Sequence, residues 1–164
     1  MIEQAHLALE GLGPAEIVRL SGREAMNELS RFTLDLLVDD ASIDPSALVD
    51  GDAVLSLRDA AGATTHFHLV VVEGSHRGHF RGKERLRLGL APPVARLLLR
   101  VDHAIFQDQT TQEIAQSILE RAGFPQAEVS FRLAGQYAKR VYCVQYGESD
   151  WAFLTRLLAD EGIN

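Results

Sequence analysis

The sequence has 164 residues, a formal net charge of −7 at pH 7, 46% hydrophobic residues and one cysteine, Cys143. This length fits one domain, or one domain and part of another, and the composition is that of an ordinary globular protein. The single cysteine excludes an internal disulfide and a thiolate zinc cluster. The negative charge argues against nucleic-acid binding, and no apolar run approaches the ~20 residues of a membrane-spanning helix. We therefore expect no nucleic-acid partner and no stable membrane insertion.

Most of the first hundred residues have the alternating apolar pattern of half-buried strands. The clearest example is Arg31–Val38 (RFTLDLLV), in which every second side chain is large and apolar. The other predicted strands are Glu16–Ser21, Ala53–Arg58, His66–Val72 and Lys83–Leu90. A short helix is expected to begin at Pro45, a residue that suits a first helical turn. Strands joined by short turns pair antiparallel, which suggests a barrel or a sandwich.

The most strongly predicted helix is Thr110–Ala122, in the second part of the chain. Thr110 and Glu113 have the spacing of a capping box, in which each side chain bonds a free amide of the first turn. Gly123 is a natural residue to follow the helix, and Pro125 prevents its continuation. Both ends of this helix are therefore encoded locally.

Two further strands are predicted, at Glu128–Leu133 and Arg140–Tyr146. A domain boundary is expected near Ala91 to Asp102, after the last strand of the β-rich half. The predicted fold class is α+β, mainly antiparallel β. We expect a β-barrel-like domain over residues 1–100 and a mixed segment of helix and strand over residues 101–164.

The end of the chain, YCVQYGESDWAFLTRLLADEGIN, has the pattern of a strand, a turn and an amphipathic helix. Gly147 permits the predicted turn, and Ser149 or Asp150 can cap the helix. The negative charges of Glu148 and Asp150 complement the positive end of the helix dipole. Each polar residue of GESD thus has a structural role, which favours a well-formed corner over a catalytic site.

The predicted helix after this corner has one apolar face and an acidic end. Its apolar residues are Trp151, Phe153, Leu154, Leu157 and Leu158. Gly162 ends the helix. Asp160 and Glu161 lie at the negative end of the dipole, which costs roughly a few tenths of a kcal/mol. We therefore expect a local cationic partner for them, such as Arg156.

Four histidines fall close together in the sequence. His66 and His68 lie two residues apart in a predicted strand and project from the same face, and His76 and His79 follow in the next predicted loop. Imidazoles on one strand face can hold a metal ion when a hairpin supplies a third ligand. Against this interpretation, no carboxylate lies at a fixed short spacing from the first pair, and solvated hairpin histidines are common. We assign no metal ligand from the sequence.

A run of basic residues surrounds the same predicted hairpin. Arg81, Lys83, Arg85 and Arg87 alternate with other residues, so in a strand they would share one face. They can form a solvated strand face or an interface to an acidic partner. A nucleic-acid site would need aromatic residues between the basic ones for base stacking, and only Phe80 is nearby.

No local motif in the sequence supports catalysis. GHFRGKE has one residue too few between its glycines for a phosphate loop, and Lys83 is followed by Glu84 where Ser or Thr is needed. GLGP lacks the third glycine of a dinucleotide-binding turn. No serine has the G-x-S-x-G context of an activated nucleophile. We expect no enzyme activity, no catalytic residue and no cofactor.

The segment VQYGESDWAFLTRLLADEGI closely resembles a signature of the VgrG spike proteins of type VI secretion systems, Q-Y-x-E-S-D-x-x-F-x-x-R-L-L-x-x-E-G-I. The matching residues are Gln145, Tyr146, Glu148, Ser149, Asp150, Phe153, Arg156, Leu157, Leu158, Glu161, Gly162 and Ile163. SGREAMNELSRFTLDL, IDPSALVDGDAVLSL and FQDQTTQEIAQSILERAG resemble other family segments, so the likeness spans Ile17 to Asn164. One departure is Leu69, which stands where the family often has glycine.

The resemblance implies β-barrel hub domains that trimerise into a pseudo-sixfold ring. Such a ring would join the hexameric Hcp tube to the puncturing spike and would associate with spike-tip and effector proteins. Under this interpretation the signature residues position structural elements and do not transfer protons. The N-terminus has no secretory signal pattern, so the resemblance implies assembly in the cytoplasm and export through the secretion apparatus. Because the family continues beyond this point, we expect the chain to be the N-terminal part of a longer protein.

Three alternatives remain open from the sequence. A close variant is the hub of a phage tail or of an extracellular contractile injection particle. A different class is a metal-dependent enzyme built on the four histidines, and the last is a binding module that uses the basic hairpin.

Overall fold

The computed structural model describes residues 2–26 and 28–163. The chain forms two compact units, Met1–Pro93 and Val94–Asn164, which we call the barrel unit and the mixed unit. Asn27 and Asn164, which fall in the segments that resemble the spike family, lie outside the described residues together with Met1.

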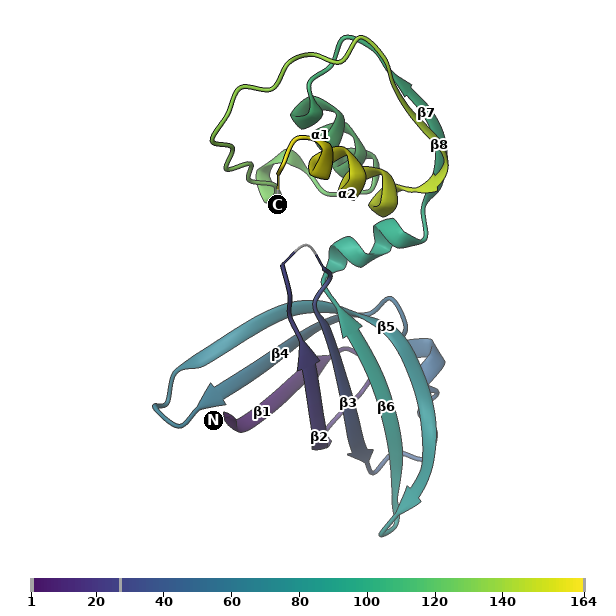
Figure 1. Ribbon diagram of the computed structural model, residues 1–164. Coiled ribbons are helices and arrows are strands. Elements are labelled where there is room, and N and C mark those ends of the chain that lie inside the picture. The colour runs from purple at the N-terminus through teal and green to yellow at the C-terminus, as the bar shows by residue number, and fades with distance from the viewer. Residues whose placement is uncertain (1, 27, 164) are drawn as a thin grey trace. The chain divides into compact units, whose positions relative to one another are not determined.

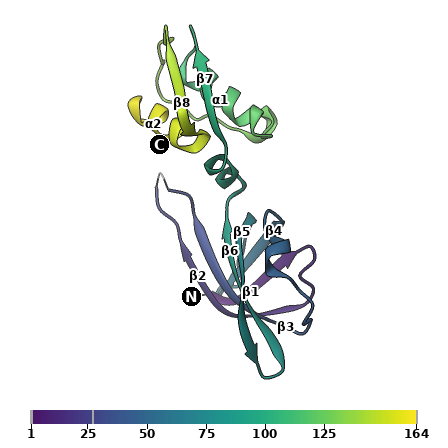
Figure 2. The same ribbon diagram turned by 90° about the vertical axis from the view of Figure 1, so that its right-hand side faces the viewer.

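The barrel unit is a single six-stranded sheet that curls into a nearly closed barrel (Figures 1 and 2). Its strands are β1 (Ile2–Leu9), β2 (Ala15–Arg23), β3 (Arg31–Val38), β4 (Asp52–Asp59), β5 (Thr64–Phe80) and β6 (Lys83–Ala91). The order across the sheet is β1-β4-β5-β6-β3-β2, and every neighbouring pair is antiparallel. Five of the six strands were predicted, and β1 was not.

Strand β5 is much longer than the sequence pattern predicts. Its first part, Thr64–Val70, pairs with β4, and its remainder pairs with β6. The strand curves strongly between these two pairings (Figure 1). The prediction that His76 and His79 lie in a loop is therefore wrong, because both belong to β5. The apolar pattern stops at Val72, but backbone pairing with β6 continues beyond it.

The barrel interior is filled by the alternating apolar residues of its strands. Leu34, Leu36, Leu86, Leu88 and Leu90 are fully buried in one cluster. The short helix η1 (Pro45–Leu48) packs on β5, where a side chain at Gly74 would collide with the Pro45 carbonyl. A truncation such as Leu→Ala in a core of this kind costs about 2–5 kcal/mol.

The mixed unit consists of a two-stranded antiparallel sheet and two α-helices, with short helical turns between them. Its elements are η2 (Pro93–Leu98), β7 (Val101–Phe106), α1 (Thr111–Arg121), η3 (Gln126–Glu128), β8 (Cys143–Ser149) and α2 (Asp150–Asp160). The helices cover one face of the β7–β8 sheet, with Phe106, Ile114, Ile118 and Phe153 at the centre of the core. Together the units confirm the α+β class that is mainly antiparallel β.

The secondary structure of the mixed unit differs from prediction in three places. β7 was not predicted. The strand predicted at Glu128–Leu133 is wrong: this stretch is the end of η3 and irregular backbone. The strand predicted at Arg140–Tyr146 is shifted, because β8 runs from Cys143 to Ser149.

The predicted ends of α1 are confirmed. The Thr110 hydroxyl accepts a bond from the Glu113 amide, and the Glu113 carboxylate accepts one from the Thr110 amide at 2.7 Å. At the other end Gly123 has φ of +93°, and the Phe124 amide bonds the Leu119 carbonyl. Among the described residues, no helix is long and apolar enough to cross a membrane.

Candidate functional site

The GESD corner is continuous strand and helix, without a turn between them. Gly147 lies inside β8 at φ +60°, as the extra residue of a bulge opposite Asp102 and His103. The predicted turn at Gly147 is therefore wrong. Ser149 is both the last residue of β8 and the N-cap of α2, and its hydroxyl accepts a bond from the Ala152 amide at 3.1 Å.

Asp150 anchors the first turn of α2 through buried hydrogen bonds. Its side chain is 2% exposed, and its two oxygens accept bonds from Gln145 Nε2 at 2.8 Å and Arg100 Nε at 3.0 Å. The Asp150 amide also donates to the Arg100 carbonyl at 2.7 Å. Gln145 is itself fully buried and donates to the Glu148 carbonyl. The carboxylate thus ties β8, α2 and the segment before β7 together.

Glu148 forms a second ion pair at the corner, with Arg156 of α2. The Arg156 guanidinium donates to both carboxylate oxygens, the shortest bond being 2.6 Å, and to the Val144 carbonyl at 2.8 Å. Hydrogen bonds from Arg156 hold the pKa of Glu148 below its usual value, and Glu148 raises the pKa of Arg156. The guanidinium also lies 4.8 Å from the centre of the Phe153 ring. Glu148 is therefore a fixed anion and is not poised to transfer a proton.

The acidic end of α2 is neutralised by Arg140. This guanidinium donates to Glu161 at 2.8 Å and lies 3.5 Å from Asp160. Glu161 also accepts a bond from the Thr111 hydroxyl at the start of α1. The expectation that Arg156 serves these two acids is wrong, since Arg156 pairs with Glu148.

The apolar residues of the signature form the core of the mixed unit. Phe153 is fully buried and stacks on Phe106 with ring centres 5.6 Å apart. Leu157 is fully buried, and Leu158 packs against the same cluster. Gly162 has φ of +68° directly after the C-cap and ends the helix as predicted.

Tyr146 is a signature residue whose side chain points away from the core of the mixed unit. Its side chain is 80% exposed on the outer face of the β7–β8 sheet and contacts His103 edge to face. Val101 and Ile105 of β7 are also more than half exposed. We call these exposed side chains, with Val144, the outer face of the mixed unit. Sheet faces of this composition are common at interfaces between proteins.

Three of the four predicted interface cations form ion pairs with carboxylates of the barrel unit. Arg85 and Arg87 both donate to buried Asp35, at 2.9 and 2.7 Å, and the Arg87 hydrogen bond is the main cause that lowers the pKa of Asp35 to about 2. Lys83 lies 3.5 Å from Asp39. Arg81 lies in the turn before β6 and contacts the Phe80 ring, so the four do not share one strand face.

The four histidines separate into two pairs. His66 and His68 are exposed on the first part of β5, where His66 Nδ1 lies 2.8 Å from the Ser56 hydroxyl. His76 and His79 converge with Glu84 of β6, each imidazole contacting the carboxylate through Nε2. Glu84 was not considered as a ligand from the sequence.

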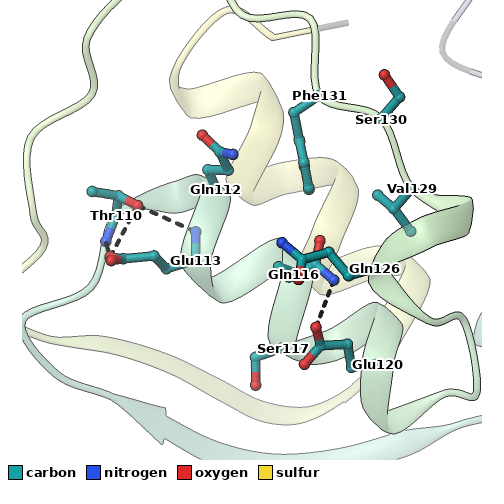
Figure 3. Close-up of a pocket in the computed structure, with 10 residues that line it drawn as sticks. All are labelled: Thr110, Gln112, Glu113, Gln116, Ser117, Glu120, Gln126, Val129, Ser130 and Phe131. Atoms are coloured by element: carbon teal, nitrogen blue, oxygen red, sulfur yellow. Dashed lines mark hydrogen bonds between the residues drawn. The ribbon is translucent and has the colours of Figure 1, made fainter.

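A groove of about 700 Å³ runs beside α1 (Figure 3). Glu113 and Glu120 lie in its wall, but the first caps α1 and the second accepts a bond from Gln116 at 2.7 Å. Its lining residues are Thr110, Gln112, Glu113, Gln116, Ser117, Glu120, Gln126, Val129, Ser130 and Phe131. The Thr110 hydroxyl and the Glu113 carboxylate in this set are bonded to each other within the capping box of α1.

Arg100 and Arg140, which complete the two main ion-pair networks, were not identified from the sequence. Arg100 lies fifty positions before Asp150, and Arg140 lies in a segment with no regular pattern. The unmatched acids Asp160 and Glu161 did indicate that a cation was needed, but they did not specify which one.

Comparison with known proteins accounts for this combination of a barrel and a helix-strand corner. Residues 23–164 match the family described as phage tail baseplate hub (GPD). The chain belongs to this family. It is 37% identical to the type VI secretion system spike protein VgrG4b of Pseudomonas aeruginosa over 96% of its length, and 28% identical to VgrG3 of Vibrio cholerae over 98%. The chain spans about one fifth of the length of these spike proteins.

Solved structures show the same architecture. The Escherichia coli c3393 protein, a type VI secretion component described as similar to the T4 tail proteins gp27 and gp5, matches with a TM-score of 0.82. The two are 26% identical, and the match covers 94% of this chain and 43% of that one. A tail protein from Neisseria meningitidis has the same fold, with a TM-score of 0.67 at 15% identity over 96% of this chain and 45% of that one.

Proposed function

We propose that this chain is part of the structural hub of a type VI secretion spike, which trimerises and joins the Hcp tube to the puncturing spike for effector delivery. The observation that carries this proposal is the match to the baseplate hub family together with 37% identity to VgrG4b. In this role the hub is assembled in the cytoplasm and exported through the apparatus, in company with spike-tip and effector proteins.

The geometry of the signature supports a structural role without enzyme activity. Asp150 and Glu148 are each bound by an arginine, and Glu161 is bound by Arg140. Carboxylates bonded to arginines in this way fix the positions of strands and helices, and Glu148, whose pKa is lowered by Arg156, is a poor general acid.

The outer face of the mixed unit is our candidate surface for contact with a second copy of the chain. It exposes Val101, Ile105 and Tyr146 side by side on β7 and β8, and each strand has one edge without a strand partner among the described residues. The basic set of Arg81, Lys83, Arg85 and Arg87 is a second candidate. We prefer the outer face, because three of the four basic residues already face Asp35 or Asp39.

The test is the assembly state of the full-length protein that contains this chain. We expect sedimentation velocity to show a trimer and co-sedimentation with purified Hcp. Ile105→Glu on the outer face is expected to weaken trimer formation by at least about tenfold, because it places a charge in an apolar contact. The matched control is Val18→Glu, which replaces an exposed apolar strand residue in the barrel unit.

Two results would count against the proposal. A full-length protein that stays monomeric at high concentration and ignores Hcp would refute the hub function. A trimer that survives Ile105→Glu would instead refute the assignment of the outer face while leaving the hub function intact.

A second candidate is the hub of a phage tail or of an extracellular contractile injection particle. It is favoured by the match of residues 23–164 to a family described as phage tail baseplate hub. Co-assembly with a phage tail tube protein in preference to Hcp would select this alternative.

A further inference from the structure

We infer that His76, His79 and Glu84 form a binding site for a divalent transition metal ion of the zinc class, at the tip of the β5–β6 hairpin. This inference is independent of the proposed hub function, because it rests on side chains that the signature does not include.

A bulge in β5 brings the two histidines to one face. Residues three apart in a regular strand project from opposite faces, since side chains alternate. Here His76 pairs with Leu86 and His79 with Glu84, so three steps along β5 match two steps along β6. Gly78, at φ +90°, lies within this extra stretch. Bulges of this kind re-aim side chains, and this one places His79 beside His76.

The register then directs Glu84 at both imidazoles. Glu84 lies directly opposite His79 and diagonally across from His76, and these cross-strand positions share a face. Each Nε2 contacts one oxygen of the carboxylate. The three ligand atoms all lie within 4.8 Å of one another. Tetrahedral zinc, with bonds of about 2.0–2.1 Å, needs donors about 3.3 Å apart, which small rotations of these side chains provide.

Burial of the three ligands suits a metal ion that enters from solvent. The Glu84 side chain is 10% exposed, whereas His79 is 70% exposed and His76 is 43% exposed. The carboxylate therefore forms the fixed floor of the site, and the two imidazoles can adjust around an ion. The open side leaves room for water as a fourth ligand.

The chemistry of the donors selects the metal. Two imidazoles and one carboxylate form the ligand set of many three-ligand zinc sites, while calcium and magnesium prefer oxygen ligands alone. A metal ion bound at Nε2 of His76 requires the ring proton on Nδ1, so the long 3.3 Å contact between the Gly78 amide and Nδ1 is given up when the metal binds.

His66 and His68 provide a matched control on the same strand. They share a face as His76 and His79 do, but the described residues bring no carboxylate into a three-ligand group with them. If any pair of strand histidines were sufficient, both pairs would bind metal equally well.

The experiment is a Zn²⁺ titration of the untagged chain against a chromophoric chelator, repeated with Co²⁺ to record the visible absorption of tetrahedral coordination. The wild-type chain is expected to bind one equivalent of metal. Excess Zn²⁺ is expected to raise Tm by about 5 °C or more. His79→Gln, at an exposed position, should weaken binding by more than about 100-fold and abolish the Tm rise. His66→Gln should change neither result.

Three outcomes would overturn the inference. Wild-type protein that takes up less than one equivalent of Zn²⁺ at micromolar concentration has no such site. Binding that His79→Gln leaves unchanged, with folding verified by circular dichroism, arises elsewhere. Binding that His66→Gln and His79→Gln weaken equally reflects nonspecific histidine affinity. Glu84→Gln serves as a second test, since it keeps both imidazoles but removes the negative ligand.

Discussion

The barrel unit and the mixed unit bury their apolar side chains in different ways. The barrel unit curls one sheet so that its apolar side chains face inward, and its buried acid Asp35 lies beneath Arg85 and Arg87. The mixed unit covers one face of a two-stranded sheet with helices and leaves the apolar residues Ile105 and Tyr146 exposed on the other.

This difference is the basis of our proposal that the outer face of the mixed unit contacts a second copy of the chain. The sheet of the barrel unit curls so that its apolar face is buried in the barrel interior. In the mixed unit the helices pack on one face of the β7–β8 sheet, and the opposite face is exposed. The ion pairs of the signature, Asp150 with Arg100 and Glu148 with Arg156, fix the positions of these strands and helices. Three substitutions and one change of pH test whether the two units are stabilised separately, as this comparison implies.

The largest effect is expected from Phe153→Ala. Phe153 is fully buried against Phe106, so its truncation should cost the mixed unit about 3–5 kcal/mol. Trp151, the single tryptophan, lies in this unit and reports its unfolding by fluorescence. Phe32→Ala is the matched change in the barrel core. If each variant shifts the tryptophan transition in urea by the same amount, the two units do not unfold separately.

Asp150→Asn should be the next most damaging change. It removes the charge that Arg100 faces and one acceptor at a position that is 2% exposed, at a cost of about 2 kcal/mol. Asp160→Asn is the control, because Asp160 is mostly exposed and 3.5 Å from Arg140, so we expect less than about 0.5 kcal/mol. Equal losses of unfolding free energy in the two variants would contradict a special role for the buried acid.

Acid should weaken the barrel unit through Asp35. Its pKa is lowered from 3.8 to about 2 by Arg87 and Arg85, so the folded form binds the proton less well than the unfolded chain does. The resulting stability is fully present above pH about 4 and is lost as pH falls through about 2, by about 2 kcal/mol. Asp35→Asn removes this dependence. Parallel curves of unfolding free energy against pH for the two proteins would refute the assignment.

The smallest effect is expected from Arg156→Lys. Lysine keeps the charge but cannot bond both Glu148 oxygens and the Val144 carbonyl together. Because Arg156 is 48% exposed and Glu148 24% exposed, the expected loss is only about 1 kcal/mol in urea unfolding. Arg132→Lys, at an exposed position in the same unit, should be neutral. A loss of several kcal/mol would contradict this expectation, because it would mean that the Arg156–Glu148 ion pair stabilises the unit far more than an exposed pair does.

Sequence reasoning succeeded where the determining interactions are local. The capping box of Thr110 and Glu113 and the stop at Gly123 involve residues only a few positions apart. The strand Arg31–Val38 was predicted with its observed bounds, because Phe32, Leu34, Leu36 and Val38 alternate along it and all face the barrel core.

Sequence reasoning failed where partners lie far apart or where backbone pairing overrides side-chain pattern. Nothing near Asp150 indicates Arg100, and the strand at Glu128–Leu133 has alternating residues but no partner strand among the described residues. Gly147 has the conformation of a turn residue, yet it forms a bulge because β7 pairs with β8 on both sides of it. The convergence of His79 with Glu84 likewise depends on a bulge that the sequence does not encode as a motif.

The direct junction of β8 and α2 at Ser149 has a mechanical consequence. β8 ends at Ser149 and α2 begins at Asp150, so no loop separates the two elements. A force that pulls along β8 is therefore transmitted directly to α2, because there is no flexible segment to extend first. The bridge from Asp150 to Arg100 and the β7 pairing then share that force between two segments of the chain. Inserting a few flexible residues at Ser149 would leave most contacts in place but would turn a stiff joint into a hinge.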